Sequence, residues 1–137
     1  MAEVDLQAIS DEIPLHRNLG LRISRSEGGI ALEAAVGPDF IVDPARGSVH
    51  GGIVATLLDA AATFALMAET RQDWVTVDLR VDYLRPLSAG SVVTTGEVVR
   101  AGRSVGRARA TVADAAGTVC AVAIGTFAPG AELTGKS

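Results

Sequence analysis

The chain has 137 residues, of which 48% are hydrophobic and 20% charged, and its net charge is −4. This length fits a single domain covering residues 1–137, with enough apolar material for a core and too little charge for a disordered chain. The sequence contains no basic block, so nucleic acid is not an expected partner, because phosphate binding needs clustered Lys and Arg.

Cys120 is the one cysteine, so an intrachain disulfide is excluded and a reducing cytoplasm is the expected compartment. The first thirteen residues are acidic and lack both the basic and the apolar segment of a signal peptide. The apolar stretch 51–68 is at the lower length limit of a membrane span, but Asp59 at its centre argues against one. We therefore expect no membrane association.

Three predicted elements precede this stretch: a short, weakly amphipathic helix and two strands that form a hairpin. They are expected at 4–12, 20–27 and 30–36. Pro14 stops the helix, so residues 1–13 form a helical extension, and Gly28-Gly29 supplies the hairpin turn. Residues 37–47 are rich in Gly, Pro and Asp and are predicted to form a loop.

A long helix is predicted at 51–70, because the segment has good helix formers, no proline and a polar exit. It is apolar on nearly every side, so other elements should surround it. Four strands are expected to follow at 74–84, 91–100, 103–114 and 118–127, and residues 129–137 form a loose tail. In the first of these strands, one face should carry Val75, Val77, Leu79, Val81 and Tyr83, and the solvated face Thr76, Asp78, Arg80 and Asp82.

The order of helix, strand, strand, long helix and four strands indicates an α+β fold. Short links between the later strands predict antiparallel pairing. A curved antiparallel sheet of about six strands wrapped around the central helix would bury a helix that has no polar face.

Chemistry is indicated where this helix begins, at His50-Gly51-Gly52, and at Asp59, the one charged residue between 51 and 68. An ionised carboxylate in apolar surroundings is costly unless it is paired or its pKa rises, so its presence favours a functional role. A purely structural Asp59, paired with an Arg, is the alternative. His50 could equally be a packed, hydrogen-bonded histidine, and His16 has no motif around it and is expected in a surface or loop position.

Gly51 and Gly52 suit a helix start that binds an oxyanion. The first helical N–H groups have no intrahelical partner and carry the positive end of the helix dipole. Glycine allows a substrate oxygen to approach them closely, although tight packing of loop against helix would also explain the pair.

With this order of elements, the chain resembles the hotdog-fold thioesterases, most closely the PaaI-type group of phenylacetyl-CoA and 4-hydroxybenzoyl-CoA thioesterases. Three segments carry the resemblance: VHGGIVATLLDAA at 49–61, TVDLRVDYLRP at 76–86 and AAGTVCAVAIGTF at 115–127. The likeness covers about residues 14–128, and the acid nine residues after the His of His-Gly-Gly is its most specific feature.

The resemblance implies a single hotdog domain that hydrolyses an acyl- or aroyl-CoA thioester to a free acid and CoA. It implies no metal and no cofactor other than the CoA of the substrate. Asp59 corresponds to the nucleophile or general base, Gly51 to the backbone oxyanion donor, and His50 to a residue of the same pocket. The hydroxyl that assists the acid would be Thr63 or Thr76, each of which could instead be bonded only to the backbone.

For substrate binding, relatives often carry Asn or Gln six residues before the His, where this chain has Pro44. Asp43 could take that place, although an ionised carboxylate cannot donate a hydrogen bond. Gly52 and Ile53 should line the acyl pocket. Arg103 and Ser104 are the first candidates for binding the CoA phosphates, with Arg85 and Arg107 as alternatives for the same role.

Asp59 lies eight residues from Gly51, about 12 Å along the helix, so one carbonyl cannot touch both in one subunit. Two such helices, antiparallel across a two-fold axis, would bring Gly51 of one chain near Asp59 of the other. We therefore expect a homo-oligomer with the active site at the dimer interface, and we favour a tetramer over a dimer. A hotdog-type enoyl-CoA hydratase or dehydratase and a non-catalytic acyl-CoA-binding module are the competing functions.

Overall fold

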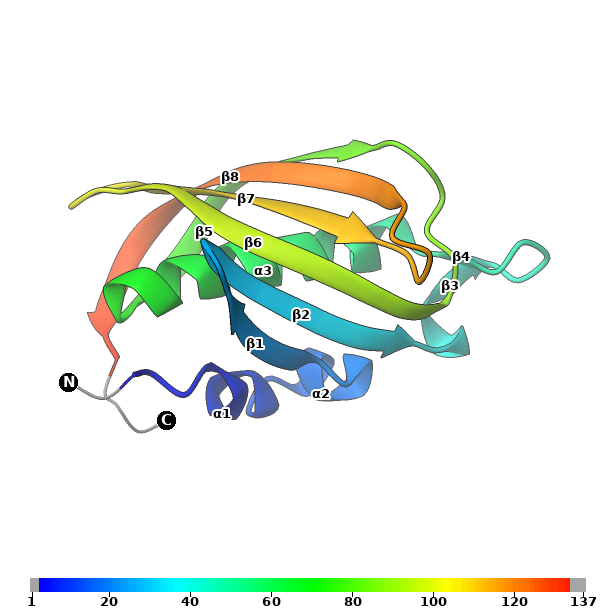
Figure 1. Cartoon of the computed structure of the whole chain (residues 1–137), viewed down its shortest axis with the longest axis horizontal. Helices are drawn as coiled ribbons and strands as arrows, with labels where there is room; N and C mark the ends of the chain where they lie inside the picture. The colour runs from blue at the N-terminus through cyan, green and yellow to red at the C-terminus, as the bar shows by residue number, and fades with distance from the viewer. Residues whose placement is uncertain (1–2, 134–137) are drawn as a thin grey trace.

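The computed structural model describes residues 3–133 and consists of one long helix held in the hollow of a curved sheet (Figure 1). The helices are α1 (Leu6–Asp11), α2 (Pro14–Leu19) and α3 (Gly51–Thr70), with a 3-10 turn η1 (Pro38–Phe40). The strands are β1 (Arg22–Ser26), β2 (Gly29–Val36), β3 (Ile41–Asp43), β4 (Ser48–Val49), β5 (Gln72–Tyr83), β6 (Gly90–Ala101), β7 (Gly106–Ala113) and β8 (Val119–Glu132).

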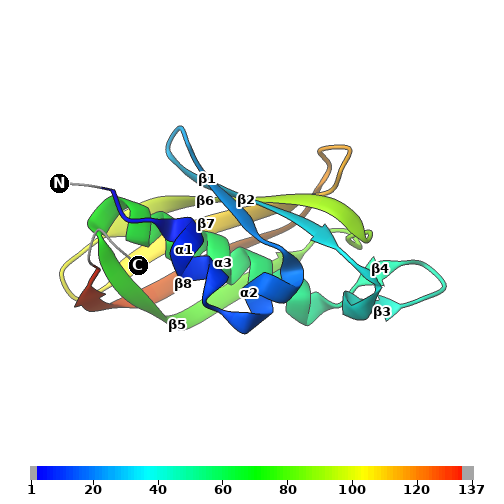
Figure 2. The ribbon, with the colours of Figure 1, turned by 90° about the horizontal axis from the view of Figure 1, so that it is seen from below.

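The main sheet has six strands in the order β1-β2-β6-β7-β8-β5, and all of its pairings are antiparallel. The predicted fold class is thereby confirmed. Figure 1 shows α1 and α2 below α3, and Figure 2, seen from below, shows them in front of it, on the side that the sheet leaves open. Strand β5, which directly follows α3, lies at one edge of the sheet, and β1 lies at the other.

Helix α3 approaches the sheet most closely where Gly96 of β6 faces Ala61. A Cβ atom at position 96 would lie 2.2 Å from the Ala61 carbonyl oxygen, so only glycine fits there. Ten residues of α3 are buried, including Leu57, Leu58 and Phe64. The helix is long and apolar enough to cross a membrane, with a mean hydropathy of 1.7, but in this fold it is the core helix that the sheet covers.

One strip of α3 is not buried, contrary to the expectation of a helix surrounded on every side. It carries Gly52, Thr56, Asp59 and Thr63, which are spaced three or four residues apart and so share one face. Asp59 is partly exposed at this strip rather than enclosed in the apolar core. The reason is that the sheet curves over one side of the helix only, and the strip faces away from its centre.

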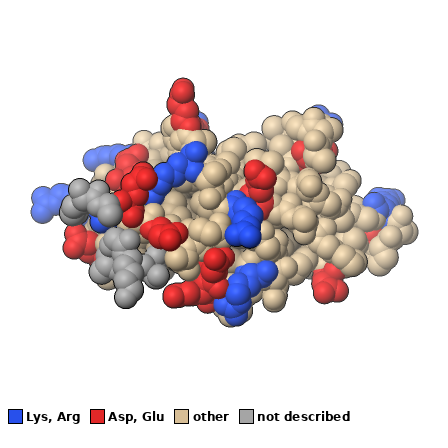
Figure 3. Space-filling view, turned by 60° about the horizontal axis from the view of Figure 1, so that its bottom comes forward, with Lys and Arg blue, Asp and Glu red and all other residues tan. Residues whose placement is uncertain are grey.

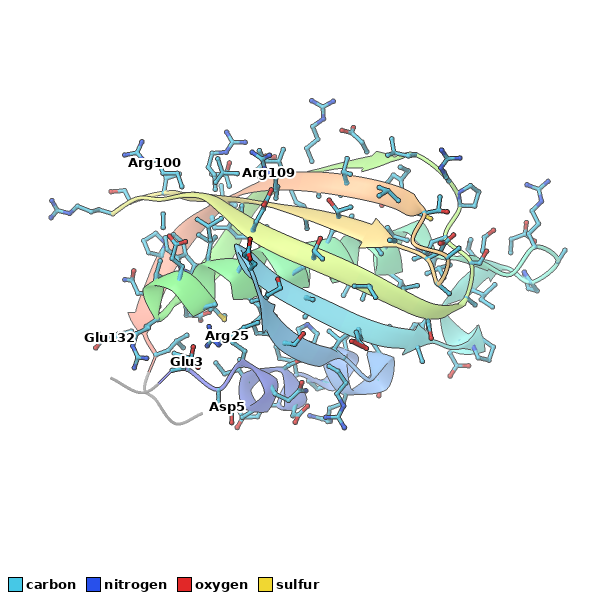
Figure 4. All side chains as sticks on the ribbon, in the orientation of Figure 1. Glu3, Asp5, Arg25, Arg100, Arg109 and Glu132 are labelled. Atoms are coloured by element: carbon cyan, nitrogen blue, oxygen red, sulfur yellow. The ribbon has the colours of Figure 1, made fainter. Side chains whose placement is uncertain are left out.

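The N-terminal segment forms two short helices, whereas one helix ending before Pro14 was predicted. Pro14 occupies the first turn of α2, where its missing N–H costs nothing. Gly20 ends α2 with a φ of 63°. The segment is fastened to β1 by an ion pair of 3.3 Å between Arg25 Nε and Glu3 Oε2, whose side chains Figure 4 labels.

The region 37–47, predicted as a loop, contains η1 and the first strand of the small β3–β4 hairpin. Short strands of two or three residues give no recognisable alternation, which explains the wrong prediction. The hairpin projects from the end of the molecule at which α3 begins (Figure 2).

The C-terminal tail was also predicted wrongly for residues 129–132, because β8 continues to Glu132. Beyond Phe127, β8 loses its partner β7 but still pairs with β5, where Pro129 lies opposite Trp74. Proline is tolerated there because the strand has a neighbour on only one side. The predicted tail at 134–137 lies outside the described residues.

Strand β5 contains a bulge that changes which residues face α3. Thr76 pairs with Phe127 and Asp78 with Thr126, so Val77 has no partner of its own. The alternation therefore shifts, and Thr76 shares the inner face with Leu79, Val81 and Tyr83, while Val75 points outward. The predicted division into two faces is wrong at this point, because the sequence alternates regularly through the bulge.

At its first residues, β5 is joined to the end of α3. The indole Nε1 of Trp74 donates to the Thr70 hydroxyl at 2.8 Å, and the ring packs where Gly106 leaves room for it.

Acidic and basic side chains are interspersed over the face shown in Figure 3, without an extended area of one sign among the described residues.

Candidate active site

The start of α3 is fixed by two hydrogen bonds of His50, one to the preceding loop and one to the first turn of the helix. The His50 N–H donates to the carbonyl of Phe40 at 2.8 Å, and its Nδ1 accepts a hydrogen bond of 2.8 Å from the Gly52 N–H. His50 is thus the N-cap of the helix. An accepting Nδ1 places the ring proton on Nε2 in the neutral histidine, so Nε2 remains available as a donor.

Of the first N–H groups of α3, only that of Gly51 has no acceptor among the described residues. The Gly52 N–H is bonded to the His50 ring, and those of Ile53 and Val54 donate to the His50 carbonyl at 2.9 and 3.1 Å. The free donor lies at the positive end of the helix dipole. Such a group is suited to binding an oxygen that carries developing negative charge.

A hollow of about 350 Å³ lies beside the residues that flank Gly51. It is lined by Asp39, Phe40, Ile41, His50, Gly52 and Ile53. Gly52 and Ile53, which are expected to line the acyl pocket, both line this hollow. Asp39 and Phe40 were not predicted, because their place beside the helix start depends on the β3–β4 hairpin.

Asp59 is held by a residue that the bulge in β5 turns inward. The Thr76 hydroxyl donates to Asp59 Oδ1 at 2.7 Å. The other predicted hydroxyl, that of Thr63, donates to the backbone carbonyl of Asp59 at 2.8 Å and does not contact the carboxylate. Thr76 is therefore the one of the two predicted threonines that contacts the acid.

His16 lies in α2 and faces α3, contrary to the expected surface or loop position. Its ring meets the Phe64 ring edge-on at 5.8 Å, and its Nδ1 is 3.0 Å from the hydroxyl of buried Ser10. Burial lowers the pKa of His16, and the negative charge of Asp59 opposes part of that shift. No local motif marks this neighbour of the acid, because the contact between His16 and Phe64 joins two helices that are far apart along the chain.

The remaining predicted binding residues lie in three separate places. Asp43 accepts from the Ala45 N–H at 3.1 Å and pairs with Arg46, and it is not among the residues lining the hollow beside His50. Arg85 lies two residues after the end of β5, near the start of α3. Arg103 and Ser104 lie in the β6–β7 turn, at the opposite end of α3 (Figure 1).

The β6–β7 turn forms a hollow of its own, of about 420 Å³. Its lining includes Arg100, Arg103, Ser104 and Arg107. Figure 4 shows Arg100 at this outward end of the sheet. Within one subunit the basic hollow and the Gly51 donor lie at opposite ends of a helix of about 30 Å, so they cannot form one compact site.

Metal binding has no support in the described side chains. Within residues 3–133, no group of three or more His, Cys, Asp or Glu residues is placed so that it could hold a metal ion. The candidate site itself offers a carboxylate, a hydroxyl and a backbone N–H donor.

Comparisons with known proteins agree with this arrangement. Residues 46–121 match the model of a family described as the thioesterase superfamily. A Halobacterium salinarum protein assigned as an esterase is 40% identical over 94 residues, 61% of this chain and 62% of that protein. The medium/long-chain acyl-CoA thioesterase YigI of Salmonella typhimurium is 34% identical over 113 residues, 71% of this chain and 73% of YigI.

Among solved structures, the PaaI protein from the phenylacetic acid degradation operon of E. coli has the same fold. The two superpose with a TM-score of 0.82 over 93% of each chain, at 23% identity.

Proposed function

Because the chain belongs to the thioesterase superfamily and has its hotdog fold, we propose that it hydrolyses an acyl-CoA thioester to a free acid and CoA. The observation that carries this proposal is that the same helix has a free N–H at Gly51 and a carboxylate at Asp59, which the Thr76 hydroxyl holds in place. The two groups match the two difficult steps of thioester hydrolysis, which are activating a nucleophile and stabilising a tetrahedral intermediate.

In this mechanism, the thioester carbonyl oxygen accepts a hydrogen bond from the Gly51 N–H. Asp59 either removes a proton from the attacking water or attacks the carbonyl carbon itself. The new carbon–oxygen bond forms first and gives a tetrahedral intermediate, which collapses by breaking the carbon–sulfur bond, so that CoA leaves as a thiolate and takes up a proton. Where Asp59 is the nucleophile, water then cleaves the acyl–Asp59 anhydride and releases the free acid. Thr76 keeps one carboxylate oxygen oriented, which leaves the other free for the reaction.

Because Gly51 and Asp59 are about 12 Å apart along α3, the proposal includes a homodimer with two shared sites. The proposed compartment is the cytoplasm. Each site would combine Gly51 of one chain with Asp59 of its partner. The free edge of β5 supports this arrangement. Val75 and Val77 are 60% and 66% exposed there, which is typical of an apolar surface that a second subunit covers.

The substrate is proposed to be a medium- or long-chain acyl-CoA, as the name of the YigI relative states for that protein. The hollow beside His50 has apolar walls from Phe40, Ile41 and Ile53, which suit an aliphatic group. The basic hollow at Arg103 and Ser104 would bind the CoA phosphates of a substrate held in a site shared with the partner. Arg85, at the other end of α3, is the alternative for this role.

CoA release, followed with a thiol reagent, tests the proposal on phenylacetyl-, hydroxybenzoyl-, hexanoyl- and palmitoyl-CoA. We expect turnover of an aliphatic substrate, and a loss of about 10²-fold or more in kcat/KM for Asp59→Asn, since the base or nucleophile is removed. Hydration of crotonyl-CoA in place of CoA release would favour a hydratase. Tight binding without any turnover would favour a binding module.

The shared site is tested by mixing two inactive variants. Gly51→Pro removes the N–H donor at a helix position where proline is tolerated, and Asp59→Asn removes the acid. If the site is shared, an equal mixture that exchanges subunits should recover about a quarter of wild-type activity, because half of the dimers carry one intact site. Exchange is verified with differently tagged chains, and a fully exchanged mixture without activity would exclude a shared site.

A further inference from the structure

We propose that Tyr83 is a positioning residue for the oxyanion donor, an inference that rests on the proposed function. Tyr83 is the last residue of β5, and its hydroxyl donates to the Gly51 carbonyl oxygen at 2.7 Å. Its ring also lies against the Gly51 backbone, since a Cβ at position 51 would be 3.6 Å from the ring carbons. Tyr83 thus contacts the residue that supplies the donor, without being that donor.

The peptide group between Gly51 and Gly52 is held at both of its polar ends. Tyr83 binds its carbonyl oxygen, and the His50 ring binds its N–H at 2.8 Å. A carbonyl oxygen has two lone pairs, so the bond to Tyr83 is compatible with an intrahelical bond to the same oxygen. Fixing this peptide restricts rotation about the Gly51 backbone, and with it the direction in which the Gly51 N–H points.

Glycine makes such an anchor necessary. Two successive glycines give the first turn of α3 the greatest backbone freedom of any residue pair, and the first turn of a helix frays most readily. A donor that moves must be ordered in each reaction cycle, whereas a fixed one stabilises the transition state without reorganisation.

The anchor itself is delivered from a rigid element. Tyr83 pairs with Ala121 of β8, and the next two N–H groups, those of Leu84 and Arg85, both donate to the Cys120 carbonyl at 2.8 and 3.0 Å. The bulge at Val77 brings Thr76 to the inner face of the sheet, which also carries Tyr83. One face of β5 therefore presents Thr76 to the acid and Tyr83 to the oxyanion donor.

Tyr83→Phe tests the inference, because it removes the hydroxyl and keeps the ring. Amide hydrogen exchange of Gly52, whose N–H is bonded to the His50 ring, should become at least about tenfold faster when measured by NMR, while that of Leu66 near the other end of α3 stays unchanged. In the same variant, kcat should fall about tenfold with KM within about twofold of wild type, because binding of the substrate does not need the fixed donor. Asp82→Asn, on the outer face of β5, is the matched control and should change neither quantity.

The outcomes separate this inference from the proposed function. Unchanged exchange at Gly52 would overturn the anchoring by Tyr83, whatever the activity. Faster exchange with a wild-type kcat, while Asp59→Asn is inactive, would overturn the positioning role alone. A wild-type protein that hydrolyses no thioester would contradict the proposed function, and the positioning role with it.

Discussion

The two sides of α3 differ in the substitutions that they tolerate. On the side that faces the sheet, Gly96 touches the backbone at Ala61 and no larger residue fits. On the opposite strip, Thr56, Asp59 and Thr63 are partly exposed, and each keeps a polar group within reach of solvent. The comparison teaches that one helix serves both as the central support of the fold and as the carrier of the acid, with the two tasks separated by about half a turn.

The largest expected effect is on the side that faces the sheet. Gly96→Ala should destabilise the protein by at least about 3 kcal/mol, because the added Cβ meets a backbone oxygen that cannot move without displacing the helix. Urea unfolding measures the change. Gly37→Ala, where nothing lies within 4 Å of the added atom, should stay within about 0.5 kcal/mol. Equal stabilities of the two variants would show that α3 does not depend on this contact.

On the strip, the two threonines next to Asp59 should differ in activity. Thr76→Val removes the hydroxyl that donates to the carboxylate and should lower kcat about tenfold, which corresponds to about 1.4 kcal/mol. Thr63→Val removes a hydroxyl bonded to a backbone carbonyl and should leave kcat within about twofold of wild type. Steady-state kinetics of both variants decide the matter, and a larger loss for Thr63→Val would reverse the assignment.

The next smaller effect is a gain in stability, which we expect on removal of a buried hydroxyl. Thr94 is 0% exposed in β6, and its Oγ1 is the one buried side-chain polar atom without a hydrogen-bond partner among the described residues. Thr94→Val keeps the shape and removes the unpaired group, so unfolding free energy should rise by about 1 kcal/mol. Thr95→Val, on the exposed face of the same strand, is the control. A loss of stability in Thr94→Val would indicate a bound water that satisfies the hydroxyl.

The smallest effect concerns His16, next to the strip. Because its pKa lies below 6.5 in the folded protein, the unfolded chain binds more protons as the pH falls below that value. The contribution to stability is therefore complete above pH 6.5 and is lost as the pH falls through the lowered pKa. Urea unfolding at pH 7.5 and 5.5 should show a larger drop for the wild type than for His16→Gln, and identical drops would contradict burial of a neutral ring.

Much of the fold could be predicted because long segments carry a clear pattern. The bounds of α3 agree with those expected for 51–70, and the six strands of the main sheet were expected close to where they lie. The β3–β4 hairpin and α2 were missed, since segments of two to six residues are too short to show a period. The bulge at Val77 was missed because the sequence continues to alternate there.

The sequence could indicate those candidate site residues that belong to one local motif. It could not indicate the residues that only folding brings to the same place. Gly51 and Asp59 stand out along the sequence by composition alone. Asp39, His16 and Tyr83 have no such signal, because each reaches the site from another element. The choice between Thr63 and Thr76 also required the structure, since it depends on which face of β5 the bulge turns inward.

The attachment of β5 to both ends of α3 has a practical consequence for spectroscopy. Trp74 and Tyr83 are the only tryptophan and the only tyrosine of the chain. Trp74 is bonded to Thr70 at the end of α3, and Tyr83 to Gly51 at its beginning. Tryptophan fluorescence and tyrosine absorbance therefore report on opposite ends of one helix, so loosening of its first turn can be followed optically in the unlabelled protein.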